Sequence, residues 1–342
     1  MLHMRNIEVL DCTLRDGAQV NAARFGHQAV VDIVQWLTDA QIELIEIGYL
    51  KDTEFEKGRT YFTCTEDMEA YVPENKQNSS YTTLLDCHKY DLNRLRDYDG
   101  RTIDVIRASF FEKDVNNVYD YCKAIMDKGY RLSVQPMDTF SYTEESLKDL
   151  FALVNKLQPE TMSIVDTYGV STPDTAERLY KLVDAELDPE IKIGFHSHNN
   201  MMNSFALMKR VLKTREDDRK LIVDSSLFGM GRGAGNLNTE IVTEQFNKEG
   251  HRPYNTKPIL DAIDTYVSEF KKEYEWGYSL PMMYAGLLGV HVNTVYYLLK
   301  KPGMTSYDLK EIFMTLDPHK RKRYDYDYLD EMYEKYMNNK KA

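Results

Sequence analysis

Cysteine is scarce in this chain of 342 residues, which contains only four. Cys12, Cys64, Cys87 and Cys122 are scattered, and no two of them form a Cys-x-x-Cys pair. A disulfide framework or a thiolate zinc site needs cysteines that are paired or clustered. The spacing therefore argues against both kinds of site, and we expect the four residues to be buried or incidental thiols.

Long apolar runs are lacking as well. No stretch of the sequence approaches the roughly 20 consecutive apolar residues of a membrane span. The first residues, Met-Leu-His-Met-Arg-Asn, contain no apolar core of signal-peptide length. We therefore expect a cytoplasmic protein without a membrane partner.

Positive charge is in deficit, since 43 Lys and Arg face 55 Asp and Glu, and the net charge is −12. Nucleic acids and anionic membranes are bound by clustered Lys and Arg, so neither is an expected main partner. The basic run at residues 319–323 is followed at once by Asp325, Asp327, Asp330 and Glu331. This pattern predicts a solvated face with balanced charges.

Short apolar runs and helix-like segments alternate along most of the chain. Eight runs rich in Ile, Val and Leu are strand candidates: residues 7–10, 42–47, 81–85, 103–108, 132–134, 162–165, 191–195 and 221–223. Segments with apolar residues at three- and four-residue spacing lie between most of them: residues 27–40, 115–128, 144–157, 173–186 and 204–213. Eightfold alternation of strand and helix is the sequence form of a (β/α)8 TIM barrel, which occupies about 250 residues. We therefore predict an α/β fold with a TIM-barrel domain over residues 1–250.

Two segments depart from this alternation. Residues 49–80 form a long polar and aromatic stretch, which is either a lid or an elaborated connection. Past residue 250 the strand pattern stops, and helical, Tyr-rich sequence continues to the end. We predict that residues 251–342 form a helical C-terminal extension packed beside the mouth of the barrel.

The first functional signal is a pair of histidines. His196 and His198 stand two residues apart at the end of the apolar run 191–195. On a β-strand this spacing points both imidazoles to one side. The pair is half of a divalent-metal site, although by itself it also fits a solvated strand edge.

Polar residues also end other predicted strands, and in a TIM barrel those ends face the active site. Glu46 interrupts the second run, and the longer polar segments are Asp11-Cys12-Thr13-Leu14-Arg15-Asp16-Gly17-Ala18-Gln19, Asp166-Thr167-Tyr168-Gly169 and Gly229-Met230-Gly231-Arg232-Gly233-Ala234-Gly235-Asn236. Mixed oxygen and nitrogen donors suit Mn²⁺, Mg²⁺ or Zn²⁺ with open positions, and such a metal polarises a carbonyl group. The glycine run has an alternative reading as an anion site at a helix start, but Ala234 breaks the dinucleotide-binding spacing.

Three motifs together resemble the DRE-TIM metallolyase superfamily, and most closely its 4-hydroxy-2-oxovalerate aldolase-like (HMGL-like) aldolases. The superfamily also includes isopropylmalate synthase and hydroxymethylglutaryl-CoA lyase. The motifs occur in the family's order and are Asp11-x-Thr13-Leu14-Arg15-Asp16-Gly17, His196-x-His198-Asn199 and Gly231-x-Gly233-Ala234-Gly235-Asn236. The combination is specific, whereas none of the three would be so alone.

The resemblance implies a role for several residues. Asp16, His196 and His198 match the family's metal ligands, and Asn236 matches an asparagine at or near the metal; Mn²⁺ is the expected ion, with Mg²⁺ or Zn²⁺ as alternatives. Arg15 matches the arginine that stabilises the enolate. A guanidinium group suits that role because it is held in place where negative charge develops.

Other polar residues have a weaker place in this scheme. Asp11 is expected to orient its neighbours, Asp166 and Thr167 to line the surroundings of the metal or the substrate pocket, and Glu46 to lie on the substrate side. The simpler alternatives are a surface ion pair between Arg15 and Asp16, a buried structural carboxylate at Glu46, and a helix N-cap or loop brace at Asp166.

The expected reaction makes or breaks a carbon–carbon bond of a 4-hydroxy-2-oxo acid through a metal-bound pyruvate enolate, as in an aldol or retro-aldol step. A Schiff-base mechanism is disfavoured, because no lysine ends the sixth strand and Lys192 begins the seventh. In the cleavage direction a base removes the hydroxyl proton and an aldehyde leaves.

The identity of that base is the main departure from the aldolases. They carry a histidine where this chain has Gln19, and glutamine takes no proton at neutral pH. His291, with Trp276-Gly277-Tyr278-Ser279, resembles the C-terminal region of aldolase-like homologues and is a candidate base, although a structural histidine is the simpler reading. Gln19 itself matches the Arg-Asp-Gly-x-Gln of acyl-CoA condensing enzymes.

Two other functions therefore stay open. One is an acyl-CoA and 2-oxo acid condensing enzyme similar to isopropylmalate synthase, although no strand pattern of a regulatory domain follows residue 250. The other is a non-catalytic metal-binding docking module. The expected partners are a small 2-oxo acid substrate, an aldehyde dehydrogenase that would receive the aldehyde, and further copies of the chain in an oligomer.

Overall fold

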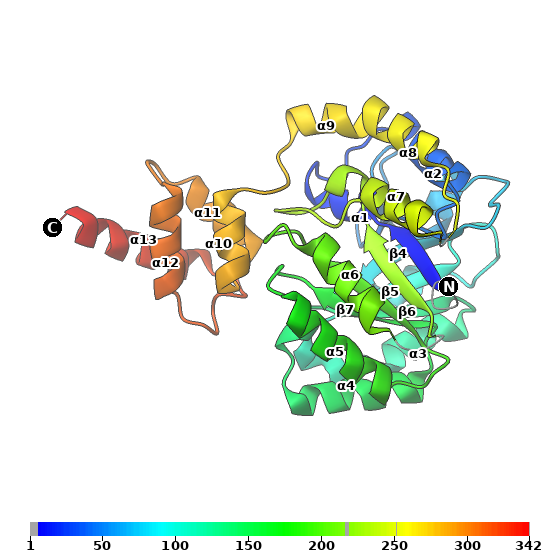
Figure 1. Cartoon of the computed structure of the whole chain (residues 1–342), viewed down its shortest axis with the longest axis horizontal. Helices are drawn as coiled ribbons and strands as arrows, with labels where there is room; N and C mark the ends of the chain where they lie inside the picture. The colour runs from blue at the N-terminus through cyan, green and yellow to red at the C-terminus, as the bar shows by residue number, and fades with distance from the viewer. Residues whose placement is uncertain (1–5, 216–218, 251, 342) are drawn as a thin grey trace.

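Eight parallel strands close into a barrel in a computed structural model that describes residues 6–215, 219–250 and 252–341 (Figure 1). The strands are β1 (Ile7–Asp11), β2 (Leu44–Leu50), β4 (Ser80–Asp86), β5 (Val105–Phe110), β6 (Arg131–Pro136), β7 (Thr161–Asp166), β8 (Lys192–Ser197) and β9 (Leu221–Ser225). β1 pairs with both β2 and β9, which closes the ring. The predicted TIM barrel is confirmed, and each of the eight apolar runs overlaps one strand.

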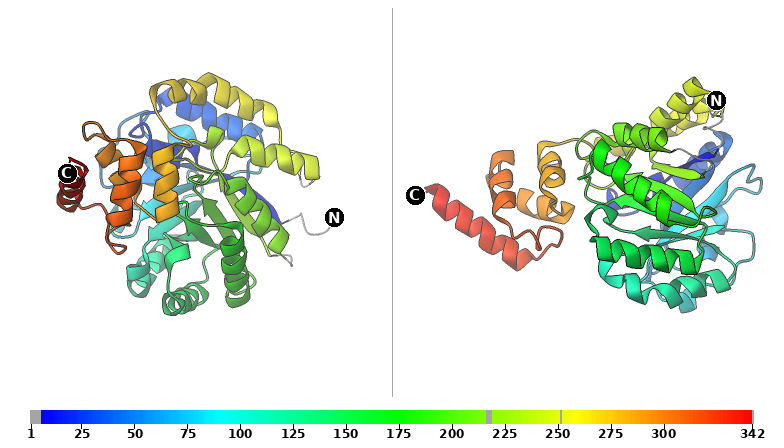
Figure 2. Two further views of the ribbon diagram at one scale, coloured as in Figure 1. Left: turned by 60° about the vertical axis from the view of Figure 1, so that its left-hand side comes forward. Right: turned by 60° about the horizontal axis from the view of Figure 1, so that its bottom comes forward.

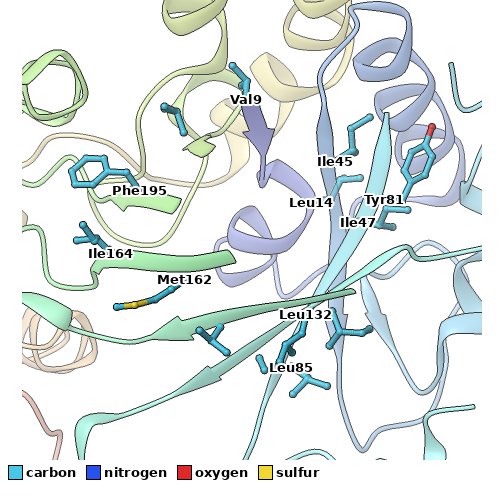
Figure 3. Packing of buried hydrophobic residues seen from close by; sticks show 14 of the residues in the cluster. Val9, Leu14, Ile45, Ile47, Tyr81, Leu85, Leu132, Met162, Ile164 and Phe195 are labelled. Atoms are coloured by element: carbon cyan, nitrogen blue, oxygen red, sulfur yellow. The ribbon is translucent and has the colours of Figure 1, made fainter. Parts of the chain in front are cut away.

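Helices cover the outside of the barrel (Figure 1). They are α2 (His27–Asp39), α3 (Tyr119–Asp127), α4 (Glu144–Leu157), α5 (Pro173–Glu186), α6 (Ser204–Thr214) and α7 (Thr239–Glu249). α2 buries Val30, Ile33, Val34 and Leu37, whose three- and four-residue spacing places them on one face. Figure 3 shows residues of the resulting core, among them Val9, Ile45, Met162 and Phe195.

The long segment between β2 and β4 is an elaborated connection. It contains the short strand β3 (Tyr61–Phe62), which pairs in parallel with the C-terminal end of β2, and a 3₁₀ helix over Thr65–Tyr71. Phe62 and Met68 are fully buried in the core. This packing favours an elaborated connection over a lid, the two alternatives predicted for residues 49–80.

The helices that follow residue 250 fall into two groups. α8 (Thr256–Ala262) and α9 (Ser268–Glu273), joined by a π-helical turn, pack on the barrel core through residues such as Ile259 and Val267. α10 (Leu280–Leu288), α11 (Val292–Leu299), α12 (Ser306–Thr315) and α13 (Tyr326–Lys341) surround a separate apolar cluster. The predicted division at residue 250 stays a prediction, and these two clusters favour a boundary between Trp276 and Met282.

The second group of helices sits at one end of the barrel, and α13 carries the C-terminus away from it (Figure 2). Asn200, which follows β8, donates to the Met282 carbonyl at 2.9 Å, and Tyr168, which follows β7, donates to the Lys322 carbonyl at 3.1 Å. Gly286 lies so close to Asn200 that an added Cβ would be 2.6 Å from its Cβ. These contacts place the extension against the carboxyl ends of the strands, as predicted.

The remaining general predictions concern membranes and cysteines. Among the described helices, none combines the length and the apolar character that crossing a membrane requires. All four cysteines are free thiols, and three of them are buried.

Candidate metal centre

Asp16, His196 and His198 converge at the carboxyl ends of the strands. Asp16 ends the one-turn helix α1 (Thr13–Asp16) that follows β1, while His196 lies in β8 and His198 directly after it. One ligand atom from each residue lies within 4.8 Å of those of the other two. One carboxylate and two imidazoles at this spacing can hold a divalent metal and leave positions open.

Hydrogen bonds to Asp11, the last residue of β1, hold the segment that carries Asp16. The Asp11 carboxylate accepts from the Thr13 backbone N–H at 2.9 Å and from the Thr239 hydroxyl at 2.6 Å. Thr13 in turn accepts from the Leu227 N–H at 2.7 Å, so β1, β9 and α7 are tied together. Burial raises the pKa of Asp11 to about 6. These contacts agree with the expected orienting role of Asp11.

Both imidazoles are held by their Nδ1 atoms. His196 Nδ1 lies 3.0 Å from an Asp224 carboxylate oxygen, and His198 Nδ1 lies 3.3 Å from the Gly235 carbonyl. A ring that donates from Nδ1 presents the lone pair of Nε2 to a metal. Burial lowers the pKa of His198 to about 4, so at neutral pH this ring is in the neutral form that metals bind.

Asp16 is held as a charged carboxylate. Arg15 donates to it at 2.8 Å and Asn236 Nδ2 at 2.6 Å. Burial opposes ionisation, but the charge of Arg15, together with the Asn236 hydrogen bond, holds the pKa of Asp16 well below its usual range. Arg15 and Asp16 are only 7% and 3% exposed, so the alternative of a surface ion pair is wrong.

Asn236 adds an oxygen next to the three ligands. Its Nδ2 donates to Asp16, and its Oδ1 is buried without a hydrogen-bond partner in the described chain. An unpaired buried amide oxygen costs free energy unless something pairs with it, and a metal or its water would do so. Gly231 leaves room for Asn236 beside Asp16. A Cβ at this position would lie 2.3 Å from Asn236 Nδ2 and 2.6 Å from an Asp16 oxygen, which is too close for any other residue.

A chain of buried ion pairs runs beneath the site and was not predicted. Arg15 Nε donates to Glu46 at 2.6 Å, and Glu46 also accepts from Arg107 at 3.0 Å. Arg107 lies in β5, is 2% exposed, and donates to the Asp224 carboxylate that holds His196. Two guanidinium groups therefore face the three carboxylates of Asp16, Glu46 and Asp224. The surplus negative charge complements a dication.

Arg107 and Asp224 could have been recognised in the sequence as charged residues within apolar strands. Each is a single charged residue inside an apolar strand, Val-Ile-Arg-Ala and Leu-Ile-Val-Asp, as Glu46 is in its own strand. Glu46 is 1% exposed and lies under Arg15. Its contacts favour the structural alternative, with Glu46 positioning Arg15, over direct contact with substrate.

The other predicted residues lie around this centre. Gln19 ends a 3₁₀ turn directly after Asp16 and is exposed. Thr167 accepts from the Asp138 N–H at 2.8 Å. Asp166 accepts from the N–H groups of Val170 and Ser171 and from the Ser171 hydroxyl. These hydrogen bonds favour the alternative in which Asp166 braces the loop after β7.

His291 lies in the C-terminal extension and faces the barrel. It caps α11, where its Nδ1 accepts from the Asn293 N–H at 3.0 Å, and its ring packs against Tyr168 at 5.9 Å and Tyr324 at 4.7 Å. Burial lowers the pKa of His291 to about 3. These contacts account for a structural histidine, and its role as a base stays a prediction.

Known proteins resemble this chain in sequence and in fold. The HMGL-like family model matches residues 6–266, the part of the chain that carries all three motifs, which confirms the resemblance and the prediction of an aldolase or lyase enzyme. 4-Hydroxy-2-oxovalerate aldolases are similar along much of their length: that of Roseiflexus sp. (strain RS-1) is 25% identical over 75% of each chain, and that of Pelotomaculum thermopropionicum is 23% identical over 100% of each. Among solved structures, the HMG-CoA lyase from Brucella melitensis superposes with a TM-score of 0.61 at 17% identity, covering 78% of this chain and 97% of the other. The N-terminal domain of a candidate aldolase from Bacteroides vulgatus superposes with a TM-score of 0.72 at 23% identity, covering 85% of this chain and 96% of the other.

Proposed function

The chain belongs to the HMGL-like family, and we propose that it is a divalent-metal-dependent aldolase that acts on a 4-hydroxy-2-oxo acid. The observation that carries this proposal is the buried cluster of Asp16, His196 and His198 with Arg15 beside it. The names of the similar 4-hydroxy-2-oxovalerate aldolases support the substrate class.

The residues present fit a metal ion. Asp16 is ionised, His198 is neutral at pH 7, and the Asn236 oxygen is buried without a partner in the described chain. Asp16, His196 and His198 would hold the ion, with Asn236 beside them, and Mn²⁺ is the ion we propose. When bound, it would supply a Lewis acid that polarises the 2-oxo group of the substrate.

In the cleavage direction the electrons move from the hydroxyl group to the 2-oxo group. A base takes the proton of the C4 hydroxyl, its oxygen becomes the aldehyde carbonyl as the C3–C4 bond breaks, and the electron pair forms the enolate of pyruvate. C3 then takes up a proton to give pyruvate. Arg15, beside the candidate metal centre, would stabilise the negative charge that develops on the enolate, and its Nε donates to Glu46, which orients it. The aldehyde could pass to a dehydrogenase partner, which stays a prediction.

A second candidate rests on Gln19. This residue stands three positions after Asp16, at the position of the expected base, and glutamine accepts no proton at neutral pH. A condensing enzyme that joins acetyl-CoA to a 2-oxo acid would give Gln19 a role without proton transfer.

One assay separates the two candidates. Pyruvate release from a panel of 4-hydroxy-2-oxo acids is measured with Mn²⁺ and with a chelator, alongside thiol release from acetyl-CoA plus 2-oxo acids. We expect pyruvate release that the chelator abolishes and Mn²⁺ restores. Thiol release without pyruvate would contradict the aldolase proposal and support condensation.

A further inference from the structure

A ladder of cations and aromatic rings leads away from Arg15 along the end of β2. The Arg15 guanidinium carbon lies 5.9 Å from the centre of the Tyr49 ring. Lys51 Nζ lies 4.9 Å from the same ring and 3.7 Å from the ring of Tyr61, and the Arg59 guanidinium carbon lies 5.1 Å from Tyr61. Arg15 and Lys51 thus contact one common ring.

The backbone builds this ladder. Residues two apart in an extended segment share a side, and Lys51, directly after β2, lies on the same side as Tyr49. β3 pairs Tyr61 opposite Tyr49, and the Lys51 N–H donates to the Phe62 carbonyl at 2.8 Å. Gly48 lets β3 approach, because a Cβ there would lie 2.2 Å from the Thr60 carbonyl oxygen.

Lys51 is half-buried, and its amine contacts aromatic rings instead of forming an ion pair with a described carboxylate. Within the described residues no carboxylate oxygen lies within 4.0 Å of its Nζ, and the nearby Asp86 is paired with Lys89 at 2.6 Å. Burial, with the positive charges of Lys89 and Arg59, lowers the pKa of Lys51. Arg59 Nε is likewise buried without a partner in the described chain. The terminal nitrogens of Arg59 already contact Glu56 at 3.3 Å and the Ala22 carbonyl at 3.4 Å. The Lys51 amine is therefore the donor available to a ligand, and Arg59 adds positive charge beside it.

A desolvated cation surrounded by other cations is stabilised by an anion. We propose that Lys51, with Arg59, forms a subsite for a second anionic group, a carboxylate or a phosphate, on the half of the substrate that becomes the aldehyde. This inference rests on the proposed function, because Arg15 and the candidate metal centre locate the 2-oxo acid half. It favours a substrate with charge at both ends over 4-hydroxy-2-oxovalerate, whose far end is a methyl group.

The test compares substrates that differ at the far end. Pyruvate release is measured from 4-hydroxy-2-oxovalerate, from 4-hydroxy-2-oxoadipate and from a 4-hydroxy-2-oxo acid with a terminal phosphate, using wild type, Lys51→Met, Lys51→Arg and the control Lys57→Met. Lys57 is an exposed lysine in the same connection. Comparing the carboxylate with the phosphate identifies the preferred anion.

We expect Lys51→Met to lose about tenfold or more in kcat/KM on the doubly anionic substrates, since a hydrogen bond between charged groups is removed. Activity on 4-hydroxy-2-oxovalerate should change little, Lys51→Arg should retain part of the preference, and Lys57→Met should match wild type. An equal loss on all substrates in Lys51→Met, or no wild-type preference for the anionic ones, would overturn the subsite.

A binding measurement separates this inference from the proposed function. If no substrate releases pyruvate, the proposed function fails, and calorimetric titration with succinate or inorganic phosphate then tests the subsite alone. Binding that Lys51→Met weakens about tenfold or more, and that Lys57→Met preserves, would support the subsite. Equal binding by wild type and Lys51→Met, or no binding by either, would overturn it.

Discussion

His196 Nδ1 and an Asp224 carboxylate oxygen lie 3.0 Å apart beneath the candidate metal centre. Asp224 is itself held by Arg107, which reaches it from β5 across the barrel interior. Burial opposes ionisation of Asp224, but Arg107 and His196 outweigh it and lower its pKa. The orientation of His196 therefore depends on Asp224 and Arg107, neither of which is among the proposed metal ligands.

Asp224→Asn should weaken metal binding. Residues that orient a metal-binding histidine contribute about 10- to 100-fold to metal affinity, and the amide removes the charge that fixes Nδ1–H of His196. The Mn²⁺ dissociation constant, measured by calorimetry or electron paramagnetic resonance, should rise within that range. Asp174→Asn is the matched control, because its side chain is 88% exposed. Unchanged affinity in Asp224→Asn would show that Asp224 has no positioning role.

Arg107→Met should destabilise the barrel. The change removes the guanidinium group that pairs with both Asp224 and Glu46 in the barrel interior, and breaking a buried ion pair costs about 3–5 kcal/mol. Urea denaturation should show this loss in the free energy of unfolding. Arg178→Met, at an exposed position of α5, should stay within about 0.5 kcal/mol of wild type. If Arg107→Met does not fold, Arg107→Lys should fold with intermediate stability; wild-type stability in Arg107→Lys would contradict the prediction.

His196→Ala should abolish both Mn²⁺ binding and pyruvate release, because it removes one of three clustered ligands. His319→Ala, at an exposed position, should change neither. Metal content is measured by atomic absorption after gel filtration. A variant that lost the metal but kept full activity would refute metal-dependent catalysis. A docking module would instead show no turnover in wild type and unchanged partner affinity in the variant.

His291 should make the protein less stable as pH falls. Burial lowers its pKa from 6.5 to about 3 in the folded chain, so between these values the unfolded chain binds a proton that the folded chain does not. The stability contribution is therefore complete above pH 6.5 and decreases as pH falls toward 3. His291→Asn keeps an N-cap but removes the titration, so its denaturation midpoint should vary less with pH over that window.

The same variant tests the predicted catalytic role. If His291 only caps α11, His291→Asn should keep near-wild-type kcat at pH 8. A general base contributes about 10²- to 10⁴-fold to the rate, so a loss of that size in a folded variant would identify His291 as the base. The pH profile of kcat, measured beside the stability curve, separates the two outcomes.

Much of the fold and part of the site could be read directly from the chain. Periodic apolar residues are local signals, and they predicted eight strands because each strand buries its own run. The proposed ligands were also predicted from the family resemblance. Strand position agrees with it, because His196 and His198 stand at the end of one strand, Asp16 follows another, and parallel barrel strands end at a common face. The role of Glu46 was harder, because one acidic residue in a strand does not reveal its partner.

The sequence by itself determined the barrel, the helical extension and the residues at the strand ends, because these depend on spacing within short segments. Only the tertiary structure decided that Arg107 joins Glu46, 61 positions away, to Asp224, 117 positions away. It also placed Lys51 against two aromatic rings, with no carboxylate oxygen of the described residues within 4.0 Å of its Nζ. Such contacts form where distant strands close around a common interior, and no local pattern records which side chains will meet there.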